Sequence, residues 1–351
     1  MAIAFSLDLH ITLGYCTTLT IMKPLTFSVL RLLSDSEFRS GETIAQGLGI
    51  SRTSVSYALR GVQEAGVTVQ KIHGRGYRLL DPVQWLDRDI ILKHLGQEKA
   101  DNFNLEVMDI IGSTNSFLLQ RIPMELNSGD TRVHAVAAEL QTNGRGRRGR
   151  QWHSGLGDGL TFSLLWQFQQ GASFLSGLSL AVGVAMIRAL ESSEIKGASL
   201  KWPNDVMFNF CKLAGILIEL QGDMFGPTVA AIGIGINLKL PKSVQARIDQ
   251  GATDVFSVTG ELPDRNKLLA ALLVNLAMAL REFERGGLAP FMEEWERYHI
   301  FKNKPATLRL PDGTTQEGVV DSVANDGSLL LRTASGIQRY STGEITLRRT
   351  T

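Results

Sequence analysis

The sequence predicts an α+β protein built from three domains in series. Two short helical segments and an alternating, glycine-rich hairpin come first, between residues 24 and 79. Strands then alternate with helices from residue 104 to 284, and short strands separated by hairpin-type turns follow residue 305. These patterns are typical of a winged helix-turn-helix, a mixed α/β domain and a small β-barrel. We therefore place the domains at 22–81, 82–302 and 303–351.

The composition is that of a globular protein without a strongly charged surface. Of the 351 residues, 44% are hydrophobic and 20% are charged, and the formal net charge is +1. Any contact with nucleic acid must therefore come from a local basic patch. No uncharged apolar run reaches the length of about 18 residues that a membrane span needs. The two cysteines, Cys16 and Cys211, lack metal-binding spacing, which predicts a reducing compartment, the cytoplasm.

The first 21 residues differ in character from those that follow. They are apolar and rich in threonine, but the first lysine is Lys23, and the stretch contains Asp8 and His10. A signal peptide begins with a basic region, so we expect no secretion signal. Residues 1–21 are predicted to be an unstructured upstream extension that contributes little to function.

Residues 41–66 have the pattern of a helix-turn-helix. Gly49 is expected to end a first short helix, and Ser51 to cap a second helix that ends near Gly66. The second helix of such a motif enters the major groove of DNA by its N-terminal residues. The candidate DNA-binding residues there are Ser51, Arg52, Thr53, Ser54 and Ser56.

Residues 67–79 alternate around a glycine-rich turn, as the strands of a wing do. Lys71, His73, Arg75 and Arg78 make this hairpin basic, and Arg75 in its turn is a further DNA-binding candidate. The alternative is a helical hairpin used for contact with another protein. The cations favour DNA binding.

The central domain is expected to contain a mixed sheet backed by helices. Its predicted strands are residues 133–140, 160–168, 216–220 and 229–238. The stretch 175–190 is too continuously apolar for a surface helix, so we expect a buried helix there. A long amphipathic helix is predicted from its cap, Asp264, to about Glu284.

The C-terminal domain is expected to be a small barrel of SH3-like size. Its predicted strands are residues 307–310, 318–323, 328–332 and 345–347. The segments Pro311-Asp312-Gly313 and Asn325-Asp326-Gly327 between them have the turn chemistry of β-hairpins.

A loop between two central strands concentrates arginine and glycine. Residues 141–152 read Gln-Thr-Asn-Gly-Arg-Gly-Arg-Arg-Gly-Arg-Gln-Trp. Glycine lets backbone N–H groups approach a ligand closely, and guanidinium groups match carboxylates and phosphates. The pattern favours an anion that carries both groups, held by a loop that folds over it. A solvated basic run, a nucleic-acid patch or a disordered segment would also fit this stretch alone.

Three further motifs accompany this arginine loop: Gly112-Ser113-Thr114-Asn115, Lys201-Trp202-Pro203-Asn204-Asp205 and Lys212-Leu213-Ala214-Gly215-Ile216-Leu217. Each alone indicates no more than a helix cap, a loop or the start of a strand. In combination with the arginine loop, they make the chain resemble the family of bifunctional biotin–protein ligases that also repress the biotin operon. The resemblance runs from about Met22 to Arg348.

This resemblance implies a two-step reaction. Biotin and ATP, with Mg²⁺, would give biotinyl-5′-adenylate and pyrophosphate. The adenylate would then acylate one lysine of the biotin carboxyl carrier protein of acetyl-CoA carboxylase. The resemblance also implies a central sheet like that of class II synthetases, a homodimer that forms when the adenylate binds, and recognition of operator DNA.

The same resemblance implies roles for individual residues. The expected biotin-binding residues are Ser113, Thr114, Asn115, Gln141, Arg145, Gly146, Arg147 and Lys212. The expected ATP- and adenylate-binding residues are Gly144, Arg148, Lys201, Asn204, Gly233, Gly235, Asn237 and Arg348. The expected catalytic residues are Lys212, Arg145, Arg147 and Asp205.

Charge explains the residue types in this set. The carboxylate of biotin must attack the α-phosphorus of ATP although both are anionic, so cations have to cancel their repulsion. Lys212 would act there as a mobile point charge. Asp205 only accepts hydrogen bonds when ionised, which suits Mg²⁺ or the ammonium group of the incoming lysine.

Three other interpretations stay open. A lipoate ligase of the same superfamily would share the sheet, but neither the arginine loop nor a DNA-binding head. A DNA-binding regulator whose central domain only senses a ligand would have lost Lys212 or the arginine loop. A ligase whose head is structural and binds no operator would have the same sequence features.

Overall fold

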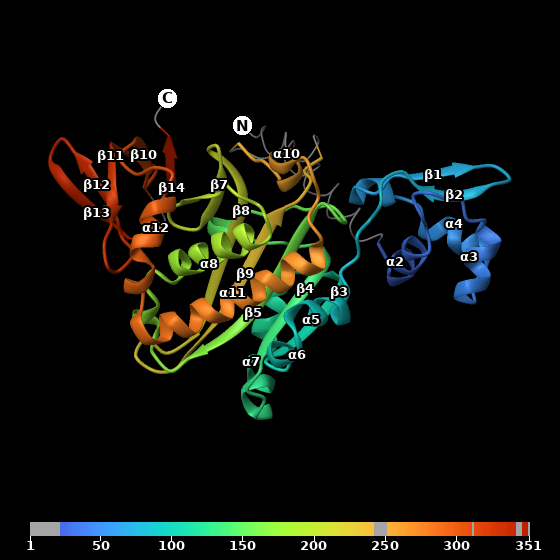
Figure 1. Cartoon of the computed structure of the whole chain (residues 1–351), viewed down its shortest axis with the longest axis horizontal. Coiled ribbons are helices and arrows are strands. Elements are labelled where there is room, and N and C mark those ends of the chain that lie inside the picture. Colours follow the sequence, from blue (N-terminus) through green and yellow to red (C-terminus); the bar gives the residue numbers. More distant parts are fainter. Residues whose placement is uncertain (1–21, 242–250, 311, 342–345, 350–351) are drawn as a thin grey trace, which may run out of the picture.

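The computed structural model describes residues 22–241, 251–310, 312–341 and 346–349. They form a central sheet domain with the N-terminal head and the C-terminal sheet at its opposite ends (Figure 1). The predicted extension 1–21 lies outside the described residues. Within them, no helix is both long and apolar enough to cross a bilayer.

The head contains helices α2 (Pro24–Arg31), α3 (Gly41–Leu48) and α4 (Arg52–Ala58), the short 3₁₀ helix η1 (Val62–Ala65), and the hairpin of β1 (Val69–Ile72) with β2 (Gly76–Leu79). Gly49 ends α3 at φ 64°, a left-handed conformation that favours glycine. Ser51 caps α4 by accepting the N–H of Ser54 at 3.1 Å. Both predicted boundaries are confirmed. The predicted helix end near Gly66 is wrong, because the backbone leaves the helix after Ala58 and turns at Gly61, with φ 75°.

The central sheet has seven strands in the order β3-β4-β5-β9-β8-β7-β6. Their bounds are β3 Phe103–Ile111, β4 Val133–Gln141, β5 Gly159–Phe168, β6 Ser199–Lys201, β7 Asp205–Phe208, β8 Cys211–Gly222 and β9 Thr228–Asn237. Strand β3 runs parallel to β4 and the other pairs are antiparallel, so the sheet is mixed, as predicted. The hairpins β6–β7 and β7–β8 follow each other at one edge of the sheet. Strands β6, β7 and β8 therefore lie side by side there.

The helices of the central domain are α5 (Arg88–Leu95), α6 (Gln97–Ala100), α7 (Thr114–Ser128), α8 (Leu178–Ser192), α10 (Val255–Thr259), α11 (Arg265–Gly286) and α12 (Met292–Tyr298). Alternation along β4 divides them between two faces of the sheet. Ala135 and Ala137 pack in the cluster that contains α8 and α11, whereas Val136 packs in the cluster under α7. Helix α8 is buried along most of its length, and Asp264 caps α11, so both helix predictions are confirmed.

The C-terminal domain is an antiparallel sheet in the order β13-β12-β11-β10-β14. Its strands are β10 Pro305–Arg309, β11 Thr315–Val323, β12 Leu329–Thr333, β13 Gly336–Tyr340 and β14 Thr346–Arg349. The sequence predicts four of these strands and misses β13. The described strands form an open sheet with β13 and β14 at its edges, so they do not show the closed barrel that the sequence predicts.

The core of the head continues into the central domain. Leu140, at the end of β4, and Leu156, after the arginine loop, are buried in the same apolar cluster as Phe27 and Val55 of the head. The N–H of Leu156 donates to the carbonyl oxygen of Ala65 at 2.8 Å. The segment that follows the arginine loop therefore packs as part of the head.

A buried ion pair fixes the linker between the head and the central domain. Arg265 of α11 lies 2.8 Å from Glu139 of β4, and the two side chains are 3% and 0% exposed. The guanidinium group of Arg265 also donates to the backbone carbonyl of Gln84, and Glu139 accepts the N–H of Leu86 at 2.6 Å. Removing either partner would leave an uncompensated buried charge, so this pair holds the linker at one place on the sheet.

Asp158 makes the contact between head and central domain sensitive to pH. A Cβ atom on Gly66 of the head would lie 2.9 Å from Asp158 Oδ2, an oxygen without a hydrogen-bond partner in the described part of the chain. Burial raises the pKa of Asp158 to about 7, although Lys239 and Arg265 oppose the rise. Stability that depends on the protonated carboxyl is therefore present at low pH and is lost as the pH rises towards about 7.

We predict that Asp158→Asn removes this pH dependence. Between about pH 4 and pH 7 the melting temperature of the wild type is expected to fall relative to that of the variant, because over this range the unfolded wild-type chain loses the Asp158 proton while the folded state keeps it; above about pH 7 the difference is constant. Calorimetry across this range measures the difference. Asp89→Asn, at a carboxylate that is 87% exposed, is the control. Parallel pH profiles for wild type and Asp158→Asn would contradict the assignment.

Candidate active site

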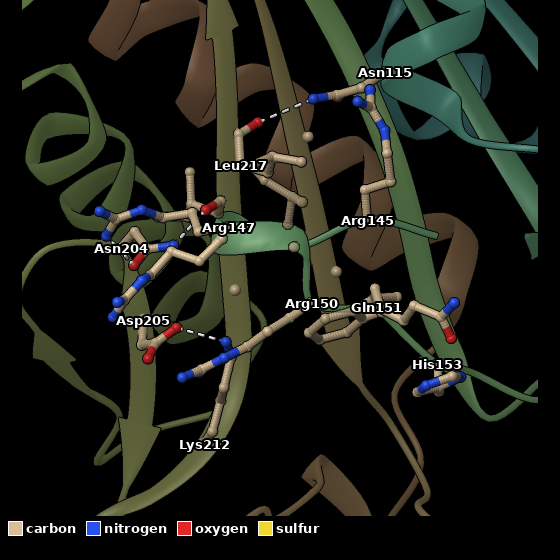
Figure 2. A pocket seen from close by; sticks show the side chains of 18 of the residues that line it. Asn115, Arg145, Arg147, Arg150, Gln151, His153, Asn204, Asp205, Lys212 and Leu217 are labelled. Atoms are coloured by element: carbon tan, nitrogen blue, oxygen red, sulfur yellow. Dashed lines mark hydrogen bonds and ion pairs between the residues drawn. The ribbon is translucent and has the colours of Figure 1, made fainter. Parts of the chain in front are cut away.

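A pocket of about 330 Å³ lies where the arginine loop faces the β6–β7 and β7–β8 hairpins. Figure 2 shows side chains that line it. The predicted site residues among its lining are Ser113, Thr114, Asn115, Gln141, Arg145, Gly146, Arg147, Arg148, Lys201, Asn204, Asp205, Lys212, Gly233, Gly235 and Asn237. The fold thus brings most of the predicted set together from separate strands and loops.

Charged groups gather at one end of the pocket, which we call the cationic end (Figure 2). Asp205, at the start of β7, lies 2.6 Å from Lys212 Nζ of β8 and 3.7 Å from Lys201 Nζ of β6. Arg147 of the arginine loop donates to Asn204 Oδ1 at 3.1 Å. Lys201 and Asp205 are direct partners in the antiparallel register of β6 and β7, so the hairpin itself sets their approach.

The cations determine the ionisation of Asp205. Burial raises the pKa of this carboxyl, but the charges of Lys212, Lys201 and Arg147 outweigh burial and hold the pKa below its usual value. Burial also lowers the pKa of the Arg147 guanidinium. The site is therefore a set of partly desolvated cations around one ionised carboxylate.

The opposite end of the pocket, which we call the neutral end, carries uncharged hydrogen-bonding groups and one compensated ion pair, Arg145 with Glu219. Ser113 caps α7, and the next residue, Thr114, donates its N–H to Gln141 Oε1 at 2.9 Å. The buried hydroxyl of Ser163 in β5 donates to Asn115 Oδ1 at 2.6 Å. These contacts satisfy buried polar atoms and hold the side chains in one arrangement before a ligand arrives.

Arg145 lies at the neutral end. Its guanidinium group donates to Glu219 Oε2 of β8 at 2.6 Å. The same oxygen accepts a hydrogen bond from Asn115 Nδ2 at 2.9 Å. Figure 2 shows Arg145 beside Asn115, away from Asp205. The sequence suggests that Arg145 and Arg147 surround the same anionic groups, but the structure places the two arginines at different ends of the pocket.

Glycines of β9 form the floor of the pocket, and Trp152 covers part of it. A Cβ atom on Gly233 would lie 2.4 Å from Asn115 Oδ1, and one on Gly235 would lie 2.3 Å from Trp152 Cε2. The Lys212 ammonium lies 5.8 Å from the centroid of the Trp152 ring. The strand surface at Gly235, which the sequence suggests for the adenylate, is thus occupied by an indole in this structure.

The arginine loop is a closed hairpin. Arg145 and Gln151 form an antiparallel bridge, and Gly146 donates its N–H to the carbonyl oxygen of Arg150 at 2.7 Å. Arg148, near the tip, has φ 62° and an exposed side chain. A left-handed conformation costs a non-glycine residue about 1–3 kcal/mol, and such strain is concentrated at functional sites.

Three other predicted residues have structural positions of their own. Asn237 lines the pocket and donates to the carbonyl oxygens of Lys212 and Thr253 at 3.3 and 3.0 Å, which anchors the start of β8. Gly144 is buried beside the pocket, where a Cβ atom would lie 2.5 Å from the carbonyl oxygen of Trp152. Arg348 pairs with a neighbouring strand of the C-terminal sheet, and its side chain lies outside the described part of the structure.

The predicted DNA-binding residues lie on the head. Those with exposed side chains are Ser51, Arg52, Thr53 and Arg75, and those that are half-buried are Ser54 and Ser56. The guanidinium groups of Arg75 and Arg78 lie 4.5 and 4.8 Å from the ring centroid of Phe38. Stacking on an aromatic ring orders these two cations, so the hairpin presents them in a fixed position.

The described residues offer magnesium one predicted ligand, Asp205, and no cluster of several. Over the described ranges, no group of three or more His, Cys, Asp or Glu side chains is arranged to hold a metal ion. Asp205, the predicted ligand, has the ammonium groups of Lys212 and Lys201 beside its two oxygens. At nucleotide sites Mg²⁺ is held by one or two carboxylates together with the phosphates, so Asp205 as a magnesium ligand stays a prediction.

The predictions made from sequence give no role to several side chains at the site, among them Trp152, which lines the pocket, and Ser163 and Glu219, which bond to Asn115. Glu219 is the one charged residue in the apolar run 213–220, and Ser163 interrupts an apolar strand. A polar residue in a buried strand needs a hydrogen-bonding partner. Their positions in apolar stretches could therefore have marked Glu219 and Ser163 as residues with a polar partner. Trp152 ends the arginine loop, but nothing in the sequence shows that it turns back over β9.

The chemistry of the pocket follows from its two ends. The neutral end offers donors and acceptors for an uncharged polar group. The cationic end holds fixed positive charges where anions would otherwise repel one another. The pocket therefore suits a ligand that is polar and neutral at one end and anionic at the other.

Family models match all three parts of the chain. An HTH domain matches residues 26–78, the biotin/lipoate A/B protein ligase family matches residues 107–237, and the biotin protein ligase C terminal domain matches residues 303–348.

Individual proteins are similar along most of the chain. The bifunctional ligase/repressor BirA of Salmonella typhimurium is 38% identical over 325 residues, which cover 93% of this chain and 97% of the relative. The protein of the same name from Escherichia coli K12 is 38% identical over 91% of this chain and 96% of its own length. The structure of the biotin protein ligase from Aquifex aeolicus in complex with biotin and ATP is similar at a TM-score of 0.58 and 29% identity. That likeness covers 70% of this chain and 99% of the other.

Proposed function

Since the chain belongs to the biotin protein ligase family, we propose that its pocket joins biotin to ATP and that its head represses transcription. The protein is an ATP-dependent biotin–protein ligase with a DNA-binding repressor domain. The reaction forms biotinyl-5′-AMP and pyrophosphate, and then transfers biotin to a lysine of a biotin carboxyl carrier protein. The observation that carries this proposal is the pair of chemically different ends in one pocket.

Biotin matches the two ends in one direction. Its ureido ring is neutral and has both donors and acceptors, which suits the arrangement of Ser113, Thr114, Asn115 and Gln141. Its carboxylate then extends towards the cationic end. We assign Arg145 to the neutral end with Glu219, because that is where its side chain is held.

The cationic end supports the joining of two anions. Lys212 and Arg147 would reduce the repulsion between the biotin carboxylate and the α-phosphate. Stabilisation of charge by fixed groups is usually the largest single contribution of a protein to catalysis. Before ligands arrive, Asp205 balances this positive charge. Once phosphates replace it as partner of Lys212, Asp205 is available to accept the ammonium group of the carrier lysine.

The nucleotide would use the remaining predicted residues, namely Arg148, Lys201, Asn204, Gly233, Gly235, Asn237 and Arg348, with Gly144 serving the fold of the arginine loop. Trp152 must leave Gly235 if the adenylate is to lie on β9. Mg²⁺ would accompany ATP, with the phosphates and Asp205 as ligands once the phosphates have taken the place of Asp205 beside Lys212. We also retain the proposals that the head is a winged helix and that the C-terminal sheet is of the SH3-like class.

The ligase proposal is tested with purified protein, ATP, biotin and a biotin carboxyl carrier domain. Biotin detected on the carrier by blotting is the expected result. Lys212→Ala is expected to slow biotin-dependent ATP–pyrophosphate exchange by about two orders of magnitude. Removal of one donor that stabilises developing charge has an effect of this size in other enzymes. Lys196→Ala, at a side chain that is 72% exposed, is the matched control. Exchange by Lys212→Ala at the rate of the control would exclude Lys212 from the reaction.

We further propose that ligand binding is coupled to DNA binding through the arginine loop. A helix-turn-helix reads two half-sites as a dimer, and a loop ordered by the adenylate lowers the entropic cost of pairing the ligase domains. Two contacts support the coupling within one chain. The loop lines the pocket, and its continuation, Leu156, is buried in the core of the head and bonded to Ala65.

Leu156→Ala is predicted to weaken this coupling. The variant should retain ligase activity, but biotin with ATP should tighten its binding to a palindromic operator less than in the wild type, as measured by fluorescence anisotropy. Leu276→Ala, in a buried position of α11 away from the head, controls for the stability cost of a core truncation, about 2–5 kcal/mol. If both variants keep the full ligand effect on DNA affinity, the path through Leu156 is refuted.

A further inference from the structure

The segment between β6 and β7, residues 201–205, rests against the C-terminal sheet. This segment carries three residues of the cationic end, Lys201, Asn204 and Asp205. Trp202 within it is fully buried, and its indole N–H donates to the carbonyl oxygen of Gly327 at 2.9 Å. Gly327 lies in the turn between β11 and β12, more than a hundred residues later in the chain.

The turn that contains Gly327 is itself docked on the central domain. Gly327 has φ 78°, and a Cβ atom there would lie 2.7 Å from the Cα of Gly177, just before α8. The hydroxyl of Ser176 donates to the carbonyl oxygen of Asp326. The turn thus approaches the backbone too closely for any side chain at residue 327, and the Gly327 carbonyl has a fixed position under the 201–205 segment.

Neighbouring contacts hold the rest of this segment to the central domain. The hydroxyl of Ser179 in α8 donates to the carbonyl oxygen of Pro203 at 2.9 Å, and Asn204 Nδ2 donates to the carbonyl oxygen of Ile216 in β8 at 2.7 Å. Trp202, in contrast, reaches the C-terminal sheet. The segment therefore contacts two domains. Lys201, Asn204 and Asp205 line the pocket, and Trp202, which also belongs to the lining, is hydrogen-bonded through its indole to the C-terminal sheet.

We propose that Trp202 is a positioning residue through which the C-terminal sheet sets the geometry of the cationic end. A buried indole N–H and its carbonyl acceptor both need a partner, so the segment keeps its hydrogen bond only in one position. Displacement of reacting groups by about 1 Å costs up to two orders of magnitude in rate. Through this bond the C-terminal sheet acts on adenylate formation, apart from any contact that Arg348 of β14 makes to the nucleotide. This inference rests on the proposed ligase function.

Trp202→Phe tests the hydrogen bond, because it keeps an aromatic ring and removes the N–H. We expect the kcat of biotin-dependent ATP–pyrophosphate exchange to fall on the order of tenfold, with the KM for biotin unchanged, since biotin is held mainly at the neutral end. The matched control is Trp166→Phe in β5. That indole nitrogen is buried and has no hydrogen-bond partner among the described residues. Equal exchange by the two variants, or a loss confined to the KM for biotin, would overturn the inference.

Gly327→Ala tests the same contact from the C-terminal side and does not depend on the stability of a tryptophan variant. It is expected to lower kcat to a similar extent, because the added methyl group moves the turn off Gly177. Gly313→Ala introduces the same left-handed strain, at φ 85°, in a turn with no atom within 4 Å of the new methyl group. Its kcat should stay at the wild-type value.

The double variant Trp202→Phe/Gly327→Ala should be no slower than the slower single variant, because both changes break one contact. If the kcat losses of the two single variants multiply in the double variant, the contact does not position the site. Equal kcat values for Gly327→Ala and Gly313→Ala would show the same. Absence of exchange in the wild type would instead refute the proposed function.

Discussion

Asp205 is the constraint on which the pocket depends. Lysine and arginine side chains brought together in a partly dry site repel one another unless a carboxylate lies between them. The β6–β7 hairpin places Asp205 opposite Lys201, and the β7–β8 hairpin brings Lys212 to the same carboxylate at 2.6 Å. The cationic end therefore exists without a ligand, and its positive charges would become available once phosphate groups replaced the carboxylate as their partner.

The two ends of the pocket belong to different parts of the fold. The neutral end is built on α7, β4 and β5, whereas the cationic end is built on the β6–β7–β8 edge that contacts the C-terminal sheet. The arginine loop connects them, with Arg145 at one end and Arg147 at the other, and its continuation at Leu156 enters the core of the head. One segment of the chain thus lines both ends of the pocket and continues into the core of the DNA-binding head, which gives a physical basis for a ligase that also regulates transcription.

Most of the pocket could be predicted from motifs, because each motif lies where a strand or helix begins or ends. Helix caps such as Ser51 and Asp264 were also predictable, since their bonds are local in sequence. The errors concern long-range effects. The turn of Trp152 over Gly235, the pairing of Arg145 with Glu219 and the early end of α4 depend on tertiary contacts or on a single glycine conformation. Strand β13 lacks a strong apolar pattern, so only its pairing with β12 reveals it.

We propose that one ligand lies across the pocket in a single direction, from the neutral to the cationic end. A crystal structure of the protein with a non-hydrolysable analogue of biotinyl-5′-adenylate tests it most directly. The ureido ring is expected beside Asn115 and Gln141, and the group that replaces the phosphate is expected within hydrogen-bond distance of Lys212, with Trp152 moved away from Gly235. A ureido ring at Lys212, or an analogue bound outside this pocket, would contradict this orientation.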